Sequence, residues 1–180
     1  IEKWNKAYNL TAIRDPGEML KLHLLDSLSI FSLVVQRATG NRLLDVGTGA
    51  GLPGVVLAIL NPEFQVYLLD TNGKKCRFLN QVQIELGVEN IQVIHDRVEN
   101  YRPSTGFNVI LSRAFATLKD MTDNAEHLLV EGGCFLAMKG RYPQQELDEL
   151  NQQFSLQEAH PLQIPGLDVE RFLMEIAVIR

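Results

Sequence analysis

The sequence lacks any hydrophobic run long enough to cross a membrane. Its longest apolar stretches, such as LAIL and FNVILS, fall far short of the roughly 18 residues that suggest a transmembrane helix. The N-terminal stretch IEKWNKAYNLT also lacks the basic and then apolar layout of a secretory signal peptide. We therefore expect a cytoplasmic protein without a membrane partner.

Cysteine and positive charge are also scarce. Cys76 and Cys134 lie far apart, with no CxxC pair and no cluster of cysteine and histidine. This usage is typical of a reducing compartment and argues against a structural zinc site, so no metal ion is expected. The formal net charge of −5 gives no global attraction to nucleic acid. Any contact with nucleic acid must then be made by a local patch.

From residue 41 onward, apolar runs of strand length alternate with segments whose apolar residues follow helical spacing. This alternation predicts an α/β fold with a mostly parallel, Rossmann-like sheet. No helical segment separates the last two runs, so they are expected to pair as an antiparallel hairpin at the sheet edge. The predicted strands are 42–46, 64–70, 90–95, 107–113, 133–140, 155–164 and 171–180, and the predicted helices are 54–60, 73–87, 118–129 and 143–154.

A length of 180 residues without an internal repeat favours a single domain. Residues 1–40 are interpreted as an N-terminal helical segment and residues 41–180 as the core that carries the sheet. In the first segment, apolar residues from Met19 to Val35 follow helical spacing and predict one helix over 18–36. The sequence starts without an initiator methionine, so the natural chain is expected to begin upstream.

Glycines are concentrated directly behind the first predicted strand, in the stretch LLDVGTGAGLPG, at Gly47, Gly49, Gly51 and Gly54. Each glycine weakens regular structure by about 0.5–1 kcal/mol relative to alanine, so the bare backbone is expected to serve a ligand. A P-loop would need a lysine after its last glycine, and this stretch has none. A dinucleotide site would match GxGxxG and has Asp70 about twenty residues further on. However, Pro53 removes one amide that would contact a pyrophosphate.

A third interpretation starts from the acid that precedes these glycines. Asp45 stands two residues before Gly47-x-Gly49-x-Gly51, and this arrangement resembles motif I of the Rossmann-like class I methyltransferases. In that fold the glycines let the backbone close on S-adenosylmethionine, which has a sulfonium and no phosphate. Asp70, at the end of the second predicted strand, suits a ribose diol because a carboxylate accepts hydroxyl hydrogen bonds. For Asp45, capping of the loop amides and direct ligand contact are equal alternatives.

Two further absences bear on the methyl acceptor. Exocyclic-amine methyltransferases usually carry an Asn-Pro-Pro-Tyr-like segment after the fourth strand, where this chain has SRAF, from Ser112 to Phe115. Methylation of a pyrimidine carbon needs a cysteine nucleophile, and the two cysteines fall inside a predicted helix and a predicted strand. Several segments together resemble the RsmG/GidB family of bacterial 16S rRNA (guanine-N7)-methyltransferases over nearly the whole chain. They are YNLTAIRDP, HLLDSL, LLDVGTGAGLPG, RVEN, SRAFA and AMKG.

The resemblance implies methyl transfer from S-adenosylmethionine to a guanine in the 530 loop of 16S rRNA, with the small ribosomal subunit as partner. A monomer is expected. Guanine N7 carries a lone pair and no proton, so the enzyme needs alignment rather than a base. Arg113, at the end of the fourth strand, is the candidate catalytic residue and is expected to hold guanine O6, a phosphate or the cofactor carboxylate. The expected cofactor contacts are Gly47, Gly49, Gly51, Leu52, Asp70, Val98 (through its backbone), Glu99 and Arg113.

The candidate substrate contacts each have a plainer alternative. His23 and Asp26 lie one turn apart on the first predicted helix, where they either contact the target nucleotide or form a surface pair. Lys139 and Arg141 either bind RNA phosphates or are solvated side chains. The same alternative applies to the other basic residues of a possible phosphate-binding rim, Lys74, Lys75, Arg77 and Lys119.

Aromatic residues leave similar choices open. Phe115 is either a residue that stacks on a splayed base or a core residue. Trp4 and Tyr8 either face RNA or pack a helix on the domain. Two other functions also stay open: a methyltransferase that acts on another RNA or a small molecule, and a non-catalytic module that binds a dinucleotide or cofactor.

Overall fold

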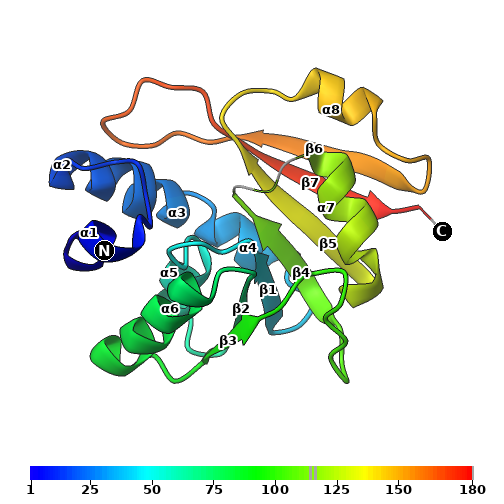
Figure 1. The fold of residues 1–180 in the computed structure, drawn as a ribbon. Coiled ribbons are helices and arrows are strands. Elements are labelled where there is room, and N and C mark those ends of the chain that lie inside the picture. The colour runs from blue at the N-terminus through cyan, green and yellow to red at the C-terminus, as the bar shows by residue number, and fades with distance from the viewer. Residues whose placement is uncertain (114, 116, 180) are drawn as a thin grey trace.

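Among the residues that the computed structural model describes, which are 1–113, 115 and 117–179, seven strands form one sheet (Figure 1). The strands are β1 (Arg42–Val46), β2 (Gln65–Asp70), β3 (Ile91–His95), β4 (Phe107–Ser112), β5 (Leu129–Lys139), β6 (Phe154–Pro161) and β7 (Phe172–Val178). Their order is β3-β2-β1-β4-β5-β7-β6, in which β1 to β5 are parallel. β7 runs antiparallel to both β5 and β6. The prediction of a mostly parallel α/β sheet with a C-terminal antiparallel hairpin is confirmed.

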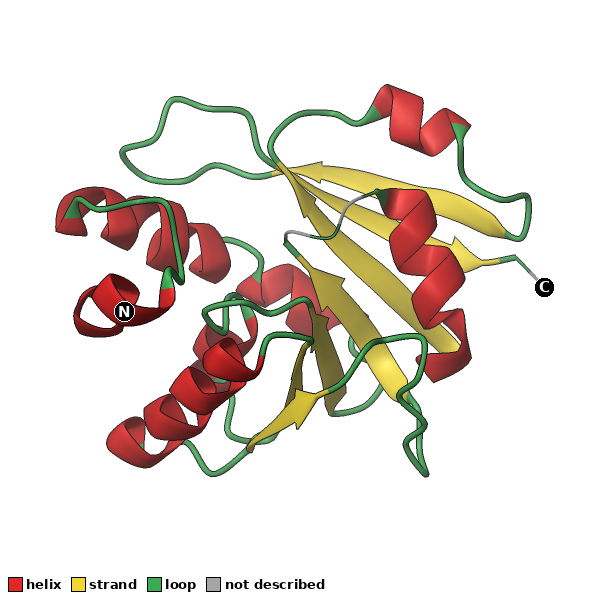
Figure 2. Ribbon diagram, viewed as in Figure 1, coloured by secondary structure: helices red, strands yellow, loops and turns green. Residues whose placement is uncertain are grey.

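The helices are α1 (Glu2–Tyr8), α2 (Pro16–Met19), the π-helical segment η1 (Leu20–Leu25), α3 (Asp26–Leu28), α4 (Phe31–Arg37), α5 (Gly54–Leu60), α6 (Gly73–Leu86), α7 (Leu118–Ala125), the 3-10 segment η2 (Glu126–Leu128) and α8 (Gln144–Asp148) (Figure 2). The helix predicted over 54–60 is confirmed. α6 ends at Leu86 and is capped, as expected, by Gly87, whose φ is 63°. The helix predicted over 143–154 is wrong in length, because α8 stops at Asp148. Within the described ranges, no helix has the length and apolar character that crossing a bilayer requires.

Alternating strand residues build a hydrophobic core on each face of the sheet. In β4, Val109 and Leu111 join one core, whereas Ile110 joins the other. Helices α4, α5 and α6 contribute to the first core, and α7 contributes to the second. Both faces of the parallel strands are therefore covered, which explains why these strands are near-continuous apolar runs in the sequence.

The N-terminal helical segment differs from its prediction. The single helix expected over 18–36 is divided, because Ser29 and Ile30 form a turn between α3 and α4. The face that turns inward is also different, since Leu28 and Val35 are 39% and 44% exposed. The buried positions of this segment are instead Met19, His23, Asp26, Ser27, Ile30 and Val34. Two of these residues are ionisable, and their polar contacts, described below, hold that face against the core.

The connection between β6 and β7 reaches back to the N-terminal helices. In Figure 1 this connection extends from the sheet toward α2. Arg171, at its end, lies 3.3 Å from Asp26 in α3. A Cβ on Gly166, within it, would lie 3.5 Å from Cε of Lys21. The carboxyl ends of the parallel strands are thus bordered by two segments that are far apart in sequence.

Candidate active site

The predicted glycine turn follows β1 and is built from left-handed backbone. The φ angles of Gly47, Gly49 and Gly51 are 65°, 61° and 82°, a conformation that glycine adopts without steric cost. The backbone N–H groups of Gly47 and Thr48 donate to the carbonyl oxygen of Leu69 in β2, at 2.9 and 3.1 Å. The turn is therefore tied to the end of the neighbouring strand.

The four glycines divide into an open pair and a packed pair. A Cβ on Gly47 or Gly49 would find its nearest neighbouring atoms at 3.9 Å, which is ordinary van der Waals contact. A Cβ on Gly51 would lie 2.6 Å from Cδ2 of Leu79 in α6, and one on Gly54 would overlap a leucine of β2. The packed pair lets α5 approach its neighbours, whereas the open pair leaves room above the backbone for a ligand.

Asp45, which is fully buried in β1, caps this turn. Its Oδ2 accepts hydrogen bonds from Oγ1 of Thr48 at 2.7 Å and from the backbone N–H of Gly54 at 2.9 Å. The capping alternative for Asp45 is thus confirmed. Its Oδ1 has no hydrogen-bond partner among the described residues. Burial raises the pKa of Asp45 to about 6, against the opposing effects of the two hydrogen bonds and of Arg113.

The start of α5 is poorly suited to a phosphate. Pro53 has no N–H, and the N–H of Gly54 donates to Asp45. The N–H of Val55 donates to the carbonyl oxygen of Gly51 at 2.7 Å. Because a pyrophosphate would need free amides at this helix start, the geometry disfavours the dinucleotide alternative.

Asp70 ends β2 and bonds to the glycine turn. Its Oδ2 accepts from the N–H of Gly49 at 2.9 Å, and its Oδ1 accepts from the N–H of Asn72 at 2.8 Å. The ammonium group of Lys75 lies 3.9 Å from Oδ2. Asp70 is 5% exposed, so its carboxylate is largely enclosed by these partners. Each carboxylate oxygen has a second lone pair with which it can accept a ligand hydroxyl.

The other expected cofactor contacts lie in different environments. Leu52 is buried in the first core and Val98 in the second, so the side chain of Val98 packs inside the protein rather than toward a ligand. Glu99 is partly exposed and pairs with Arg97 at 3.2 Å. A hydrogen bond from its own backbone N–H, helped by Arg97, lowers the pKa of Glu99.

A cavity of about 290 Å³ beside the end of β4 is lined by His23, Arg113 and Lys139, three residues expected in the site. Asp26, the expected neighbour of His23, makes a fourth. It is also lined by Arg171. Arg141 is not among these lining residues; it is exposed and borders a separate hollow. The structure therefore brings together four segments that are distant in sequence, and Lys139 lies between this cavity and the hollow that Arg141 borders.

Asp26 is surrounded by the cationic groups of this cavity. Its Oδ2 lies 3.6 Å from Nη1 of Arg113, and its Oδ1 lies 3.3 Å from Nε of Arg171. Arg113 also donates to the carbonyl oxygen of Leu22 at 3.3 Å. Burial raises the pKa of Asp26, and the two arginines oppose that effect. The interpretation of His23 and Asp26 as a helix-surface pair is wrong, because they are 5% and 3% exposed.

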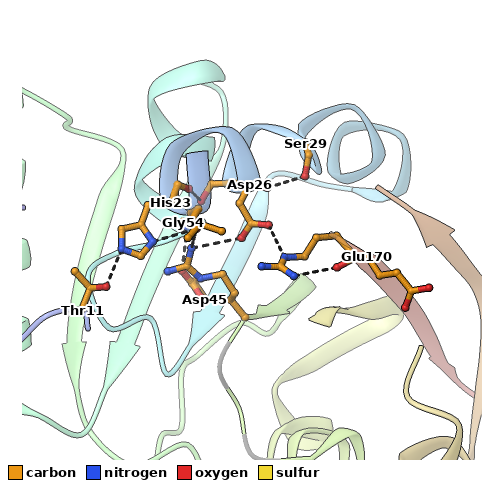
Figure 3. A network of polar contacts seen from close by, with 11 residues as sticks. Thr11, His23, Asp26, Ser29, Asp45, Gly54 and Glu170 are labelled. Atoms are coloured by element: carbon orange, nitrogen blue, oxygen red, sulfur yellow. Dashed lines mark hydrogen bonds and ion pairs between the residues drawn. The ribbon is translucent and has the colours of Figure 1, made fainter. Parts of the chain in front are cut away.

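His23 is held as a neutral imidazole in one orientation. Its Nδ1 lies 3.1 Å from the carbonyl oxygen of Leu22, and its Nε2 lies 2.9 Å from Oγ1 of Thr11 (Figure 3). A carbonyl can only accept, so Nδ1 carries the proton and Nε2 accepts from the threonine hydroxyl. Burial, followed by the charge of Arg113, lowers the pKa of His23.

Besides Lys75, two of the lysines expected at the rim are already paired with carboxylates. Lys139 lies 2.7 Å from Oε2 of Glu146, an oxygen that also accepts from the N–H of Leu118 at 2.7 Å. Lys119 pairs with Asp123 at 2.9 Å. These contacts favour a structural role for the two lysines over a row of free phosphate ligands.

The aromatic candidates also lie in different surroundings, some packed on the domain and one beside the glycine turn. Trp4 contacts Tyr8 at a ring-centroid distance of 5.3 Å and Phe78 of α6 at 6.1 Å, so these residues pack α1 on the domain. Phe115 is half-buried against the second core, and its Cδ2 is the atom that a Cβ on Gly47 would meet first. Its neighbours in the SRAFA segment, Ala114 and Ala116, lie outside the described residues.

Sequence reasoning missed Arg171, which lines this cavity, and Thr11, which contacts His23. Arg171 falls in the last predicted strand, where no motif distinguishes it from a solvated arginine. Thr11, the partner of His23, is itself held by the buried side chain of Asn5, which bonds both its N–H and its carbonyl oxygen at 3.0 Å. A buried histidine implies a polar partner in general, but nothing local in the sequence identifies Thr11 as that partner.

A larger hollow of about 890 Å³ lies beside the first residues of β5 and the last residues of β7, away from the cavity at Arg113. Beside it, Glu158, His160 and Glu175 bring three metal-ligand atoms within 4.8 Å of one another. The guanidinium of Arg37 lies 2.7 Å from Glu175 and 3.3 Å from Glu158, so a protein cation already offsets part of the charge of these carboxylates. The absence of a metal ion stays a prediction.

Comparison with known proteins gives one consistent result. The family model GidB, described as rRNA small subunit methyltransferase G, matches residues 1–174. The chain is 49% identical to the ribosomal RNA small subunit methyltransferase G of Psychromonas ingrahamii, over 98% of this chain and 83% of that protein. It is 52% identical to the protein of the same name from Ectopseudomonas mendocina, over 96% of this chain and 79% of that protein. The solved glycopeptide N-methyltransferase MtfA, complexed with S-adenosylmethionine, shares the fold, with a TM-score of 0.72 and 11% identity over 86% of this chain and 87% of that one.

Proposed function

Because this chain belongs to the GidB family, we propose that it transfers a methyl group from S-adenosylmethionine to N7 of a guanine in the 530 loop of 16S rRNA. The observation that carries this proposal is the family match over residues 1–174. The relatives are named as methyltransferases of small-subunit ribosomal RNA, which supports the small ribosomal subunit as the partner.

The glycine turn fits the proposed cofactor. The space above Gly47 and Gly49 suits a bulky group without phosphate. Asp45, which caps this turn from β1, has one oxygen, Oδ1, without a hydrogen-bond partner among the described residues. When bound, S-adenosylmethionine supplies a methyl group that its sulfonium charge activates for transfer. The residues proposed to hold it are Gly47, Gly49, Gly51, Leu52, Asp70, Val98, Glu99 and Arg113.

The proposed acceptor atom requires no catalytic base. Guanine N7 attacks with its lone pair and loses no proton, so the protein has to align the base, and orientation supplies most of the rate gain. Arg113 is the proposed catalytic residue in this sense: its side chain is 23% exposed and can donate to guanine O6 or to a phosphate. His23, Lys139 and Arg141 are the proposed substrate contacts: His23 lines the cavity, and the two cations are proposed to meet RNA phosphates, for which Lys139 would have to share or leave its contact with Glu146.

We also propose that the protein acts as a monomer, without a metal ion, in the bacterial cytoplasm where ribosomal subunits assemble. Support for the metal-free mechanism comes from the chemistry, because neither the attack by N7 nor the departure of the thioether needs a Lewis acid. A dinucleotide-binding module is the weaker alternative, since the first amides of α5 are absent or already bonded.

Acceptor competition tests the proposed function. Small ribosomal subunits that lack N7 modification are incubated with labelled S-adenosylmethionine, in the presence of large subunits and transfer RNA. We expect label on the small subunits alone, and label on either competitor would identify a different acceptor. Calorimetry with S-adenosylmethionine and NAD tests the cofactor, because tighter binding of NAD would favour the dinucleotide alternative.

The Arg113→Ala variant tests the role of that side chain. We expect transfer to small subunits to fall by roughly 100-fold, because a base that is misaligned by about 1 Å reacts that much more slowly. The melting temperature should show that the variant is folded. An unchanged rate of transfer would remove Arg113 from the mechanism.

A further inference from the structure

Asp26 is a buried carboxylate to which the proposed reaction gives no direct part. It is 3% exposed, and each of its oxygens faces a different arginine. Arg113 follows β4, Arg171 precedes β7, and Asp26 belongs to α3, so this carboxylate joins three segments at the cavity wall. We propose that Asp26 is a positioning residue for methyl transfer, which acts by fixing the guanidinium of Arg113, with Arg171 as its second anchor. This inference rests on the function proposed above.

The charges around Asp26 explain why one carboxylate is needed there. Arg113 and Arg171 carry permanent positive charges and approach the same carboxyl group at 3.6 and 3.3 Å. In a partly buried site such like charges repel strongly unless an anion lies between them. Without the charge of Asp26, the two guanidinium groups are expected to move apart and to lose these distances from the carboxyl group.

Stability alone is a poor reason for this arrangement. A buried ion pair gains little net stability, because the charges lose their hydration on burial. The raised pKa of Asp26 reflects the same loss of hydration. A buried carboxylate that holds arginines at the wall of a cavity is therefore better explained by the positions that it imposes on them.

The positions matter because of the chemistry proposed for guanine. N7 has to stay free to accept the methyl group, so an arginine must direct its N–H groups to O6 or to a phosphate instead. Arg113 is anchored by the carbonyl oxygen of Leu22 and by Asp26, and its side chain remains 23% exposed. Its guanidinium has five N–H donors, so it can serve both anchors and a substrate atom. A small rotation of this group would redirect the donors and lower the rate, whereas the contacts proposed for the cofactor in the glycine turn and at Asp70 would stay in place.

The Asp26→Asn variant tests the inference, because it keeps the shape of the side chain and removes its charge. With small ribosomal subunits as acceptor, we expect kcat to fall by about 10- to 100-fold. The KM for the subunits and the Kd for S-adenosylmethionine, measured by calorimetry, should both change much less than kcat, because most of the contacts proposed for the cofactor do not involve Arg113. Wild-type kcat in this variant would overturn the inference.

Glu175→Gln is the matched control. Glu175 is also buried, at 8% exposure, and also bridges two side chains, Arg37 at 2.7 Å and His160 at 3.1 Å. It is absent from the lining of the 290 Å³ cavity. We expect this variant to lose a similar amount of thermal stability and to keep the wild-type kcat. An equal loss of kcat in both variants would show a general effect of removing a buried carboxylate, and the inference would be wrong.

A double variant tests the route through Arg113. If Asp26 acts by fixing that side chain, Asp26→Asn should change kcat by less than about twofold in an Arg113→Ala background, because contributions of coupled residues do not add. Multiplied effects would contradict the inference. Should Asp26→Asn fail to fold, Asp26→Glu takes its place: it keeps the charge but moves it by one methylene, and it should lower kcat without unfolding the protein. Wild-type kcat in Asp26→Glu would then overturn the inference.

These assays distinguish a failure of the proposed methyl transfer from a failure of the role proposed for Asp26. If the wild-type protein transfers no methyl group to small subunits, the proposed function is wrong. If the wild type transfers and Asp26→Asn transfers equally well, the proposed function stands and only the role of Asp26 is wrong.

Discussion

Asp45 binds a proton more tightly in the folded protein than in the unfolded chain. Its pKa is about 6 in the fold, against an ordinary value of 3.8. Below about pH 4 the group is protonated in both states. As pH rises from about 4 to about 6, the unfolded chain ionises first and the folded state loses stability, and above that range the loss is constant. At roughly 1.4 kcal/mol per pKa unit, this group alone costs the fold on the order of 3 kcal/mol at neutral pH.

We predict that the Asp45→Asn variant lacks this pH dependence. Its amide keeps a carbonyl oxygen for Thr48 and Gly54 and cannot ionise. The free energy of unfolding of the variant minus that of the wild type should therefore rise by roughly 3 kcal/mol between pH 4 and pH 7, since the other titrating groups cancel in the difference. Urea unfolding without cofactor at several pH values measures it. A difference that stays constant over this range would contradict the raised pKa of Asp45.

At the scale of elements, the glycine turn combines two kinds of glycine whose substitution should affect cofactor binding and stability to different degrees. Gly49→Ala places a methyl group in open space on left-handed backbone, which costs about 1–2 kcal/mol of stability. Gly54→Ala overpacks the contact between α5 and β2 and brings a Cβ within 2.9 Å of Oδ2 of Asp45. Such overpacking typically costs about 1–3 kcal/mol.

We predict that Gly49→Ala weakens binding of S-adenosylmethionine by more than about tenfold, because the methyl group occupies the space proposed for the cofactor. Gly54→Ala should lower the melting temperature at least as much while changing the affinity less. Differential scanning calorimetry and titration calorimetry on the two variants give the comparison. Equal losses of affinity would show that the turn does not divide into ligand-facing and packing glycines.

The elements themselves were predicted where a local pattern decides them. Apolar runs of strand length identify β1, β2 and β4 to within one or two residues, because buried parallel strands need such runs on both faces. Gly87 marks the end of α6, because its left-handed conformation terminates the helix. The glycine turn was predictable for the same reason: backbone geometry is encoded by the residues that adopt it.

The N-terminal helices show where local pattern fails. Apolar spacing favoured a buried face that includes Leu28 and Val35, yet the structure buries His23 and Asp26. Their partners lie 12 to 145 positions away, at Thr11 and at two arginines next to the ends of strands. No periodicity encodes such contacts. For this reason the sequence predicted the wrong buried face for the N-terminal helices and gave no sign of the role of Arg171.

At the scale of the whole molecule, the net charge of −5 limits how the protein can hold RNA. Several cations near the site are already paired, such as Lys139 with Glu146 and Lys119 with Asp123. Few positive groups are then left to displace counterions from the phosphates. The site depends instead on the meeting of the N-terminal helices, the end of β4 and the β6–β7 connection around one cavity.

We predict a shallow salt dependence of RNA binding. With about two to four phosphates neutralised, the slope of log K against log salt concentration should lie between roughly −1.5 and −4. Fluorescence anisotropy of a labelled fragment containing the 530 loop, measured between 50 and 300 mM salt, would determine the slope. A slope steeper than about −6 would show that a wide basic surface binds the RNA, and it would contradict this prediction.

The most direct test of the central claim is to map the methyl group on the product. Small ribosomal subunits lacking N7 modification are incubated with the protein and S-adenosylmethionine, and the 16S rRNA is then cleaved chemically at 7-methylguanine. We expect one new cleavage site, at a guanine of the 530 loop, and it should appear only when both the protein and the cofactor are present. Cleavage elsewhere, or methylation without cleavage at any guanine, would contradict guanine N7 of the 530 loop as the acceptor.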